Sequence, residues 1–278
     1  MLRIRSMILS DLPAAMCLSR GAGWNQVEGD WLRFLAIEPE GCFVAESEGV
    51  VVGTTVGCTF GTVAWIAMVL VAPAERGRGV ATSLTQHAIE WLEGRGVRTI
   101  RLDATPAGQP IYEKLGFDAQ YELARYGGRL ALVERASGAE PALPDELDQL
   151  IELDRRVTNT PRRKWLTPLF ADWPEAVRVV RRGGEILGFA AARRGAEAVQ
   201  VGPCVGDAEA GALLLRDAGR RYGGKAAYMD VPLPNPAAAQ HADGMGLRVQ
   251  RHLLRMCRGE PVCEDVMQLW SSSGPEMG

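Results

Sequence analysis

The chain has 278 residues, which is enough for about two domains at ~150 residues each. Hydrophobic residues make up 47% and charged residues 23%; these are ordinary values for a globular protein and exclude a largely disordered chain. The formal net charge of -3 gives no electrostatic reason to expect nucleic acid as the main partner, so we expect a small molecule.

The six cysteines are scattered and form no Cys-x-x-Cys pattern or other spacing typical of a zinc site, so no metal is predicted. Cys42, Cys58 and Cys257 lie in apolar runs where reduced thiols serve as small core residues, and we expect a cytoplasmic protein. Residues 1–13 lack the apolar core of a signal peptide. The longest apolar run is far shorter than the ~20 residues of a membrane span, so no membrane partner is predicted.

The first half alternates between strand and helix patterns. Strands are predicted at residues 2–7, 42–45, 50–56, 62–71, 97–103 and 117–126, and helices at residues 12–20, 27–39, 80–94 and 109–115. This order predicts an α/β (α+β) fold with a mixed, mostly antiparallel sheet.

The same order of elements returns in the second half, with strands around Gly183-Gly184, a helix over residues 207–222 and a closing strand over residues 247–257. Residues 134–144 lose periodicity and are predicted to be a linker. We therefore predict two tandem copies, with a first domain at 1–133, the linker at 134–144, a second domain at 145–260 and a tail at 261–278.

The most informative stretch is Arg-Gly-Arg-Gly-Val-Ala at residues 76–81, between a buried strand and an amphipathic helix. Gly77 and Gly79 let the backbone approach a ligand closely, and the first N–H groups of the helix have no partner within it. Such a site fits a phosphate group, although a solvated turn ahead of a surface helix is the alternative. The second copy instead has the acidic stretch at residues 205–211, which disfavours a phosphate.

Two motifs in order carry a family resemblance. Arg76-x-x-Gly79-x-Ala81 follows one strand, and residues 111–117, Ile-Tyr-Glu-Lys-Leu-Gly-Phe, follow the next. With both motifs, the first half resembles a GCN5-related N-acetyltransferase, and the whole chain resembles the tandem members of that family with a degenerate second copy. The resemblance implies transfer of an acetyl group from acetyl-coenzyme A to an amine, with no metal.

The resemblance also implies roles for individual residues. The glycine loop would bind the coenzyme pyrophosphate, and the end of the preceding strand would pair with the pantetheine arm in the manner of an added strand. These cofactor-binding residues are Val69, Leu70, Val71, Arg76, Gly77, Arg78, Gly79, Val80 and Ala81. Thr105 and Gly108 stand where relatives often have Asn and Ala, a departure in the turn that would also contact the coenzyme.

Tyr112 matches the family's usual general acid, which protonates the departing thiolate; the alternative is a packing role beside Phe117. The central strand carries no carboxylate to act as general base. Asp103 is the candidate nearest by topology, Glu28 and Asp30 are others, and a water molecule is a further alternative.

The acceptor site is predicted between the first two helices, where Trp24, Asn25 and Gln26 follow a glycine-rich break and Glu28 lies two residues further on. We expect this segment to be exposed and to bind the acceptor, with Trp24 capping the core as the alternative. The basic run from Arg162 to Trp165 is expected to be a solvated face rather than a nucleic-acid site.

The prediction is an N-acetyltransferase that binds one acetyl-coenzyme A in its first copy and acts on a small-molecule amine, with the second copy completing or covering the acceptor site. The alternatives are transfer of a longer acyl group, or an acyl-coenzyme A binding regulatory module without turnover. A monomer or homodimer is expected.

Overall fold

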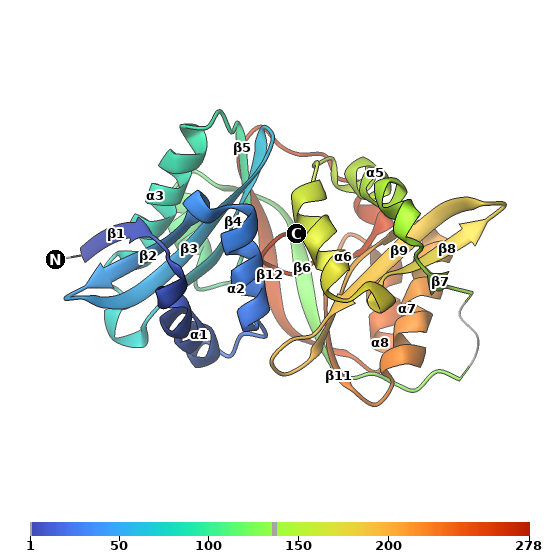
Figure 1. The fold of residues 1–278 in the computed structure, drawn as a ribbon. Coiled ribbons are helices and arrows are strands. Elements are labelled where there is room, and N and C mark those ends of the chain that lie inside the picture. Colours follow the sequence, from blue (N-terminus) through green and yellow to red (C-terminus); the bar gives the residue numbers. More distant parts are fainter. Residues whose placement is uncertain (1, 135–137) are drawn as a thin grey trace. The chain divides into compact units, whose positions relative to one another are not determined.

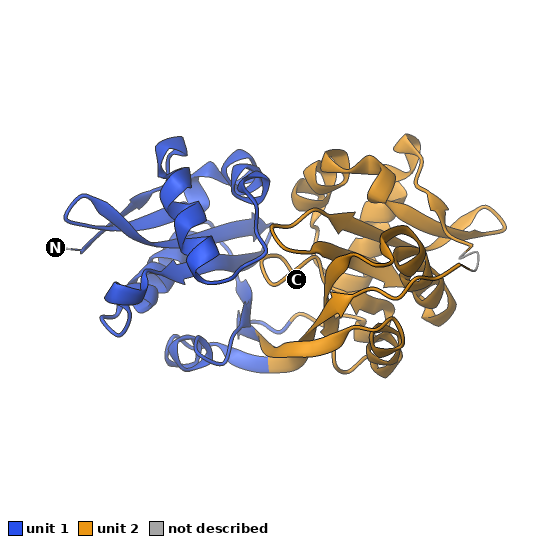
Figure 2. Ribbon diagram, turned by 90° about the horizontal axis from the view of Figure 1, so that it is seen from below, with its two compact units in different colours: residues 1–119, 256–261 blue, residues 120–255, 262–278 orange. Residues whose placement is uncertain are grey.

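The computed structural model describes residues 2–134 and 138–278, and the chain divides into two compact units (Figure 2). Unit 1 comprises residues 1–119 and 256–261, and unit 2 comprises residues 120–255 and 262–278. These divisions differ from the predicted boundaries at 133 and 145, because strand β6 (Asp118–Arg129) pairs with β11 (Ala226–Pro232) of unit 2. Residues 135–137 of the predicted linker lie outside the described residues.

Unit 1 is built on a mixed sheet with the strand order β1-β2-β3-β4-β5, beside which lies the end of β12. Its strands are β1 (Leu2–Ser6), β2 (Cys42–Ser47), β3 (Val50–Phe60), β4 (Val63–Val71), β5 (Thr99–Ala104) and residues 256–259 of β12 (Arg248–Gly259). Its helices are α1 (Leu12–Gly21), α2 (Glu28–Ile37), α3 (Val80–Glu93) and α4 (Gln109–Lys114) (Figure 1). Strands β4 and β5 pair in parallel, whereas β1 with β2, β2 with β3 and β3 with β4 pair antiparallel.

Helix α3 lies close to the sheet because the strand beneath it carries glycines. A Cβ atom on Gly53 would come within 2.9 Å of a methyl group of Leu84, and a Cβ atom on Gly57 within 3.3 Å of Leu92. The apolar face of α3 that was predicted from its helical spacing is fully buried at Leu84, Ala88 and Leu92. This packing fixes the start of α3 beside the end of β4, where the glycine loop lies.

Unit 2 repeats the order with the strand sequence β12-β6-β11-β10-β9-β8-β7, and β13 also pairs with β10. Its further strands are β7 (Glu140–Pro141), β8 (Arg178–Arg182), β9 (Glu185–Arg193), β10 (Val199–Gly206) and β13 (Leu269–Ser271). Its helices are α5 (Leu147–Thr158), α6 (Arg163–Asp172), α7 (Ala208–Tyr222) and α8 (Pro236–Gly244). The predicted α+β fold, a mixed and mostly antiparallel sheet with helices in each copy, is confirmed.

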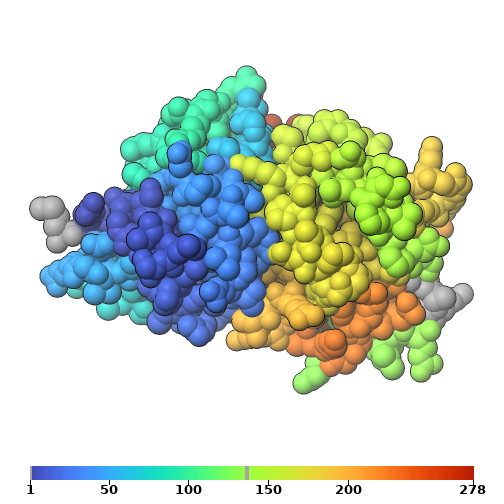
Figure 3. Space-filling view, in the orientation of Figure 1, coloured from blue at the N-terminus to red at the C-terminus, as the bar shows by residue number. Residues whose placement is uncertain are grey.

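Two segments of unit 2 differ from their prediction. The basic run is not a solvated face as a whole: Arg162 and Trp165 are buried, and α6, which was not predicted, begins at Arg163. Arg162 lies inside because its guanidinium is paired with the buried carboxylate of Asp154, with N–O distances of 2.6 and 3.0 Å. The outer side of α6 contributes to the surface seen in Figure 3.

The second difference concerns the predicted tail, residues 261–278, of which residues 262–278 belong to unit 2. They pack into unit 2, and Trp270, Ser272 and Met277 are buried.

In the described part of the chain, no helix is both long and apolar enough to cross a bilayer.

Candidate active site

The end of β4 is shaped by a bulge. Thr54 pairs with Leu70 and Val56 pairs with Ala67, so two residues of β4 stand opposite one of β3. Met68, one of these two, has a φ of 55°, which is uncommon for a residue with a side chain. The buried Thr54 hydroxyl donates a hydrogen bond to the Met68 carbonyl oxygen at 2.7 Å. Neither Thr54 nor Met68 was predictable as part of the site, because a bulge inside a uniformly apolar run leaves no pattern in the sequence.

Beyond the bulge, β4 separates from its parallel neighbour. The pairing of β4 with β5 covers only residues 63–65, from Val63 opposite Thr99 to Trp65 opposite Arg101. Among the described residues, no strand pairs with residues 66–71 on this side. The predicted pantetheine contacts at Val69, Leu70 and Val71 therefore belong to a strand end with a free edge, as an added extended ligand requires.

The glycine loop follows directly. Gly77 and Gly79 have φ values of 75° and 81°, a conformation that favours glycine, and a Cβ atom on either would meet nothing within 4 Å. The glycines are thus needed for the turn and not for space. Gly79 is also the residue that precedes α3, where it offers no side chain to cap the first N–H groups of the helix.

The charges around the loop favour an anion. Arg76, Gly77, Arg78 and Gly79 are all exposed, and the first turn of α3 holds no acidic residue. Arg76 Nε donates to the carbonyl oxygen of Val71 at 3.2 Å, and Arg78 forms an exposed ion pair with Glu75 at 3.1 Å. Uncapped helix N–H groups with two guanidinium groups nearby suit a phosphate or pyrophosphate.

Tyr112 lies on α4 with its ring packed at the turn before the helix. The ring is half-buried, its centroid lies 6.0 Å from that of Phe117 in an edge-to-face arrangement, and a Cβ atom on Gly108 would lie 2.9 Å from it. The absence of a side chain at Gly108 thus leaves room for the ring. Burial raises the pKa of Tyr112 to about 12, so the phenol is protonated at neutral pH and is able to donate.

The candidate bases differ in their surroundings. Asp103 is half-buried at the penultimate position of β5, two residues beyond the last residue that pairs with β4. Asp30 is buried and engaged: it accepts from the Val27 N–H at 2.9 Å and pairs with Arg33 at 3.0 Å. Glu28 is exposed at the start of α2. Asp30 is thus held by its partners, and the choice of Asp103 as general base stays a prediction.

The predicted acceptor segment is mostly internal. Trp24 is half-buried, and its backbone N–H donates to the Ser19 carbonyl oxygen at 3.0 Å. Asn25 and Gln26 are buried, with exposed fractions of 2% and 4%, so the expectation of an exposed polar pair is wrong. The glycine-rich break ends α1 but does not release the chain to solvent, because the next residues turn inward ahead of α2.

The same positions in unit 2 carry different chemistry. The turn after α8 matches the turn after α4. The backbone N–H of Phe117 donates to the backbone carbonyl oxygen of Tyr112 at 3.0 Å, and the backbone N–H of Leu247 donates to that of Ala242 at 3.2 Å. Ala242 thus occupies the position of Tyr112. Asp207 precedes α7, and its carboxylate caps the N–H groups of Glu209 and Ala210 at 3.0 and 2.8 Å.

Comparisons with known proteins agree with this geometry. Residues 10–117 match the model of the "Acetyltransferase (GNAT) family", and residues 150–271 match the model of an "Acetyltransferase (GNAT) domain". The chain is 26% identical over 260 residues to the holothin acyltransferase of Pseudoalteromonas sp. (strain SANK 73390), which covers 92% of this chain and 87% of that protein. It is 33% identical over 101 residues to an N-alpha-acetyltransferase, MAK3, of Arabidopsis thaliana, over 34% of this chain and 53% of that protein.

Solved structures share the whole fold. A candidate acetyltransferase from Pyrococcus horikoshii has a TM-score of 0.86 at 22% identity and covers 100% of this chain and 96% of its own. A GCN5-related N-acetyltransferase from Sphaerobacter thermophilus has a TM-score of 0.67 at 15% identity, with 98% of each chain covered. At these identities the likeness concerns the fold of the complete chain.

Proposed function

Because this chain belongs to the GCN5-related N-acetyltransferase (GNAT) superfamily and contains two GNAT domains, we propose that it transfers an acyl group from acyl-coenzyme A to an amine of a small molecule. The observation that carries the proposal is the combination in unit 1 of a free edge on β4 with an uncapped helix start immediately after it. An extended pantetheine arm suits the former, and a pyrophosphate suits the latter.

In the proposed reaction the amine nitrogen attacks the thioester carbonyl carbon directly. The carbon–nitrogen bond forms, the carbon–sulfur bond breaks, and the departing thiolate takes the proton of the Tyr112 hydroxyl, which water then restores. The proton lost by the amine passes to Asp103 or to a water molecule. Backbone N–H groups at the end of β4 stabilise the oxyanion of the tetrahedral intermediate.

The acceptor class is proposed from the relative that spans most of the chain. That relative is called a holothin acyltransferase, and its name supports a small-molecule amine over a protein N-terminus. We propose acetyl as the transferred group, with a longer acyl chain as the alternative that this relative's name leaves open. A binding module without turnover is the runner-up.

We further propose that the second copy is degenerate and that each chain binds one coenzyme. Two replacements support this: Ala242 stands in the position of Tyr112, and the Asp207 carboxylate occupies the helix N–H groups that a pyrophosphate would need. A carboxylate there also repels the phosphates.

The test combines coenzyme binding with turnover. Calorimetry with acetyl-coenzyme A is expected to give one site per chain, and release of free thiol is expected with at least one member of a panel of small amines. A panel of acyl-coenzyme A thioesters of increasing chain length then identifies the donor. Tight coenzyme binding without thiol release on any acceptor or donor would favour the binding module and defeat the proposal of an enzyme.

A further inference from the structure

Unit 2 contains the same strand separation as unit 1, but here it is filled. The parallel pairing of β10 with β11 covers Val199 opposite Ala227 and Gln200 opposite Tyr228. Residues 201–206 then continue beyond the pairing, just as residues 66–71 do on β4. The register of β10 against β9 also shifts in this stretch, between Val201 and Cys204.

Strand β13 lies in this separation. It pairs with β10 in the antiparallel sense, with Cys204 opposite Ser271 and Val205 opposite Leu269. On the other side, the Ser272 N–H donates to the carbonyl oxygen of Asp230 on β11 at 2.9 Å. Counted from the last paired residue of each strand, Cys204 and Val205 correspond to Val69 and Leu70 of β4.

We propose that the groove between β10 and β11 is a peptide-binding site, and that its ligand is the chain's own segment 266–278. The segment enters as an added strand and takes the position that the coenzyme arm takes in unit 1. The comparison with the coenzyme rests on the proposed function, whereas the peptide site rests on the contacts within unit 2 alone.

Trp270 is the main anchor of the segment. It is 1% exposed, and its Nε1–H donates to the Gly206 carbonyl oxygen at 3.2 Å. It lies so close to α7 that a Cβ atom on Gly211 would fall 2.0 Å from its ring. A glycine in the first turn of α7 is therefore what makes room for the tryptophan.

The backbone of the segment is recognised as well. Asn235 Nδ2 donates to the carbonyl oxygens of Met267 and Leu269 at 3.0 and 3.2 Å, while its Oδ1 accepts from the Ala238 N–H. A Cβ atom on Gly202 would lie 2.0 Å from the Ser272 carbonyl oxygen, so this glycine permits close backbone approach. These contacts recognise an extended main chain, as strand-addition sites do.

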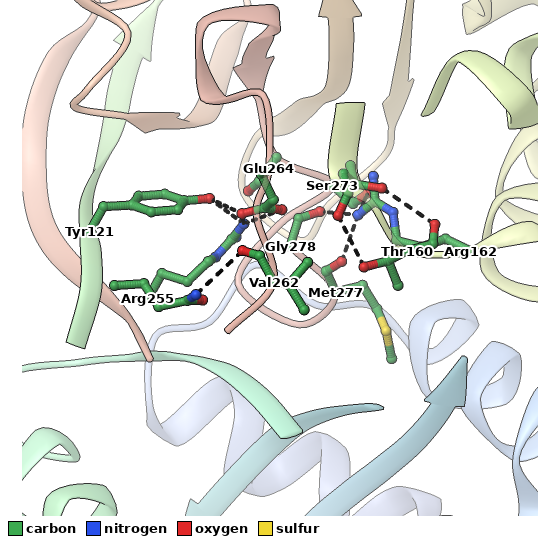
Figure 4. Close-up of polar contacts among 12 residues, drawn as sticks. Tyr121, Thr160, Arg162, Arg255, Val262, Glu264, Ser273, Met277 and Gly278 are labelled. Atoms are coloured by element: carbon green, nitrogen blue, oxygen red, sulfur yellow. Dashed lines mark hydrogen bonds and ion pairs between the residues drawn. The ribbon is translucent and has the colours of Figure 1, made fainter. Parts of the chain in front are cut away.

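Buried charges hold the distal part of the segment. Arg193 is paired with Glu276, and both side chains are almost fully buried. Arg162 donates to the Met277 carbonyl oxygen at 2.7 Å, to the Gly278 carbonyl oxygen and to the Ser273 hydroxyl (Figure 4). Removal of the segment would leave these guanidinium groups buried without those partners, which is unfavourable. The segment is therefore an integral ligand of unit 2.

Cys204 supplies a reporter in the full-length chain, because its free thiol is buried directly opposite Ser271. The experiment measures alkylation of each cysteine by mass spectrometry, with exposed Cys17 and Cys263 as internal references. In Trp270→Ala, Cys204 is expected to react about 100-fold faster than in the unaltered chain, the effect of truncating a buried tryptophan. Trp31→Ala in unit 1, which truncates a fully buried tryptophan whose indole N–H is also hydrogen-bonded, is the matched control and is expected to leave the rate at Cys204 unchanged.

A synthetic peptide of residues 266–278, added to Trp270→Ala, is expected to restore protection of Cys204, whereas millimolar coenzyme A is expected to leave it reactive. Protection by coenzyme A instead of the peptide would overturn the proposal, as would equal reactivity of Cys204 and Cys17 in the unaltered chain. Should Trp270→Ala fail to fold, hydrogen exchange of the unaltered chain decides: the amides of residues 269–272 are expected to exchange as slowly as those of β10. Loss of coenzyme binding in unit 1 with these results intact would count against the proposed function alone.

Discussion

The two copies of the strand, loop and helix show how one fold supports opposite chemistry. In unit 1, residues 72–79 separate β4 from α3, and the helix begins after Gly79 without a capping side chain. In unit 2, Asp207 alone separates β10 from α7, and its carboxylate caps the helix. A helix start that is left unsatisfied attracts an anion, whereas a start that is capped from within gains stability and offers no such site.

The strands before these loops show the same contrast. Past its bulge, β4 keeps a free edge among the described residues, while β10 is covered by β13. Both copies therefore share the separation of two parallel strands as a feature of the fold. The local sequence decides what fills that separation. Four comparisons, from the largest expected effect to the smallest, test whether the copies have diverged in this way.

The largest effect is expected for Asp230, which follows the parallel pairing on β11 as Asp103 does on β5. Asp230 is fully buried and bonded to Arg125 at 2.7 and 2.8 Å. Asp230→Asn breaks this buried pair and is expected to lower the free energy of unfolding by about 3 kcal/mol in urea denaturation. Asp103→Asn, the matched substitution in unit 1, is expected to change it by less than ~1 kcal/mol while reducing turnover.

Asp230 also gives this pair a pH dependence. The Arg125 guanidinium holds the pKa of Asp230 below its ordinary value of 3.8, so the stabilisation is present above that value and is lost as the pH falls through the lowered pKa. The difference in stability between the unaltered chain and Asp230→Asn is therefore expected to shrink below pH 3.8. A difference that persists unchanged in strong acid would contradict this role.

The next effect concerns Tyr112. Tyr112→Phe is expected to lower kcat by about 100-fold, the typical contribution of a general acid, with little change in the Kd of the coenzyme. Tyr228→Phe in unit 2 is the matched control and is expected to leave kcat unchanged. Steady-state release of free thiol measures both. An unaltered kcat in Tyr112→Phe would show that this tyrosine only packs beside Phe117 and is not the general acid.

The third prediction transfers the unit 2 chemistry to unit 1. Gly79→Asp places a carboxylate before α3, and we expect the Kd of coenzyme A to rise about 30-fold, or ~2 kcal/mol, through repulsion of the phosphates. Gly79→Asn is the control, because Asn has the same size and tolerates positive φ equally but carries no charge. Equal losses in calorimetry for both variants would show that backbone strain, and not charge, limits binding.

The smallest effect is the reverse change in unit 2. Asp207→Ala removes the helix cap and is expected to cost about 1 kcal/mol of stability, as measured by thermal unfolding. It is not expected to create a second coenzyme site, because β13 still covers β10. Two coenzyme molecules per chain in calorimetry of this variant would show that the cap alone closes the second copy.

Much of this organisation was predictable from the sequence because it rests on periodic patterns. The buried run that became β4, the helical spacing of α3 and the paired glycines of the loop each have a direct physical signature. The repeat of the order in the second half was predictable for the same reason. The family resemblance at residues 76–81 and 111–117 is confirmed by the matches over residues 10–117 and 150–271.

Other features depend on contacts between distant residues, and no local pattern records them. Asn25 and Gln26 are polar and follow a glycine-rich break between α1 and α2, yet both are buried. Arg162 begins a basic run, yet it is buried because its guanidinium group is bonded to Asp154 and to the Met277 carbonyl oxygen. The strand at β13 is three residues long, too short to show an alternating pattern.

The division of β12 between the two units has a consequence for protein synthesis. Residues 256–261 belong to unit 1, where the Thr99 hydroxyl donates to the Glu260 carbonyl oxygen at 2.8 Å and Arg258 pairs with Glu93 at 2.8 Å. Unit 1 thus leaves the ribosome without its last strand, and β5 has an open edge until most of the chain has been made. A gene fragment that ends in the linker would therefore encode a first domain without residues 256–261.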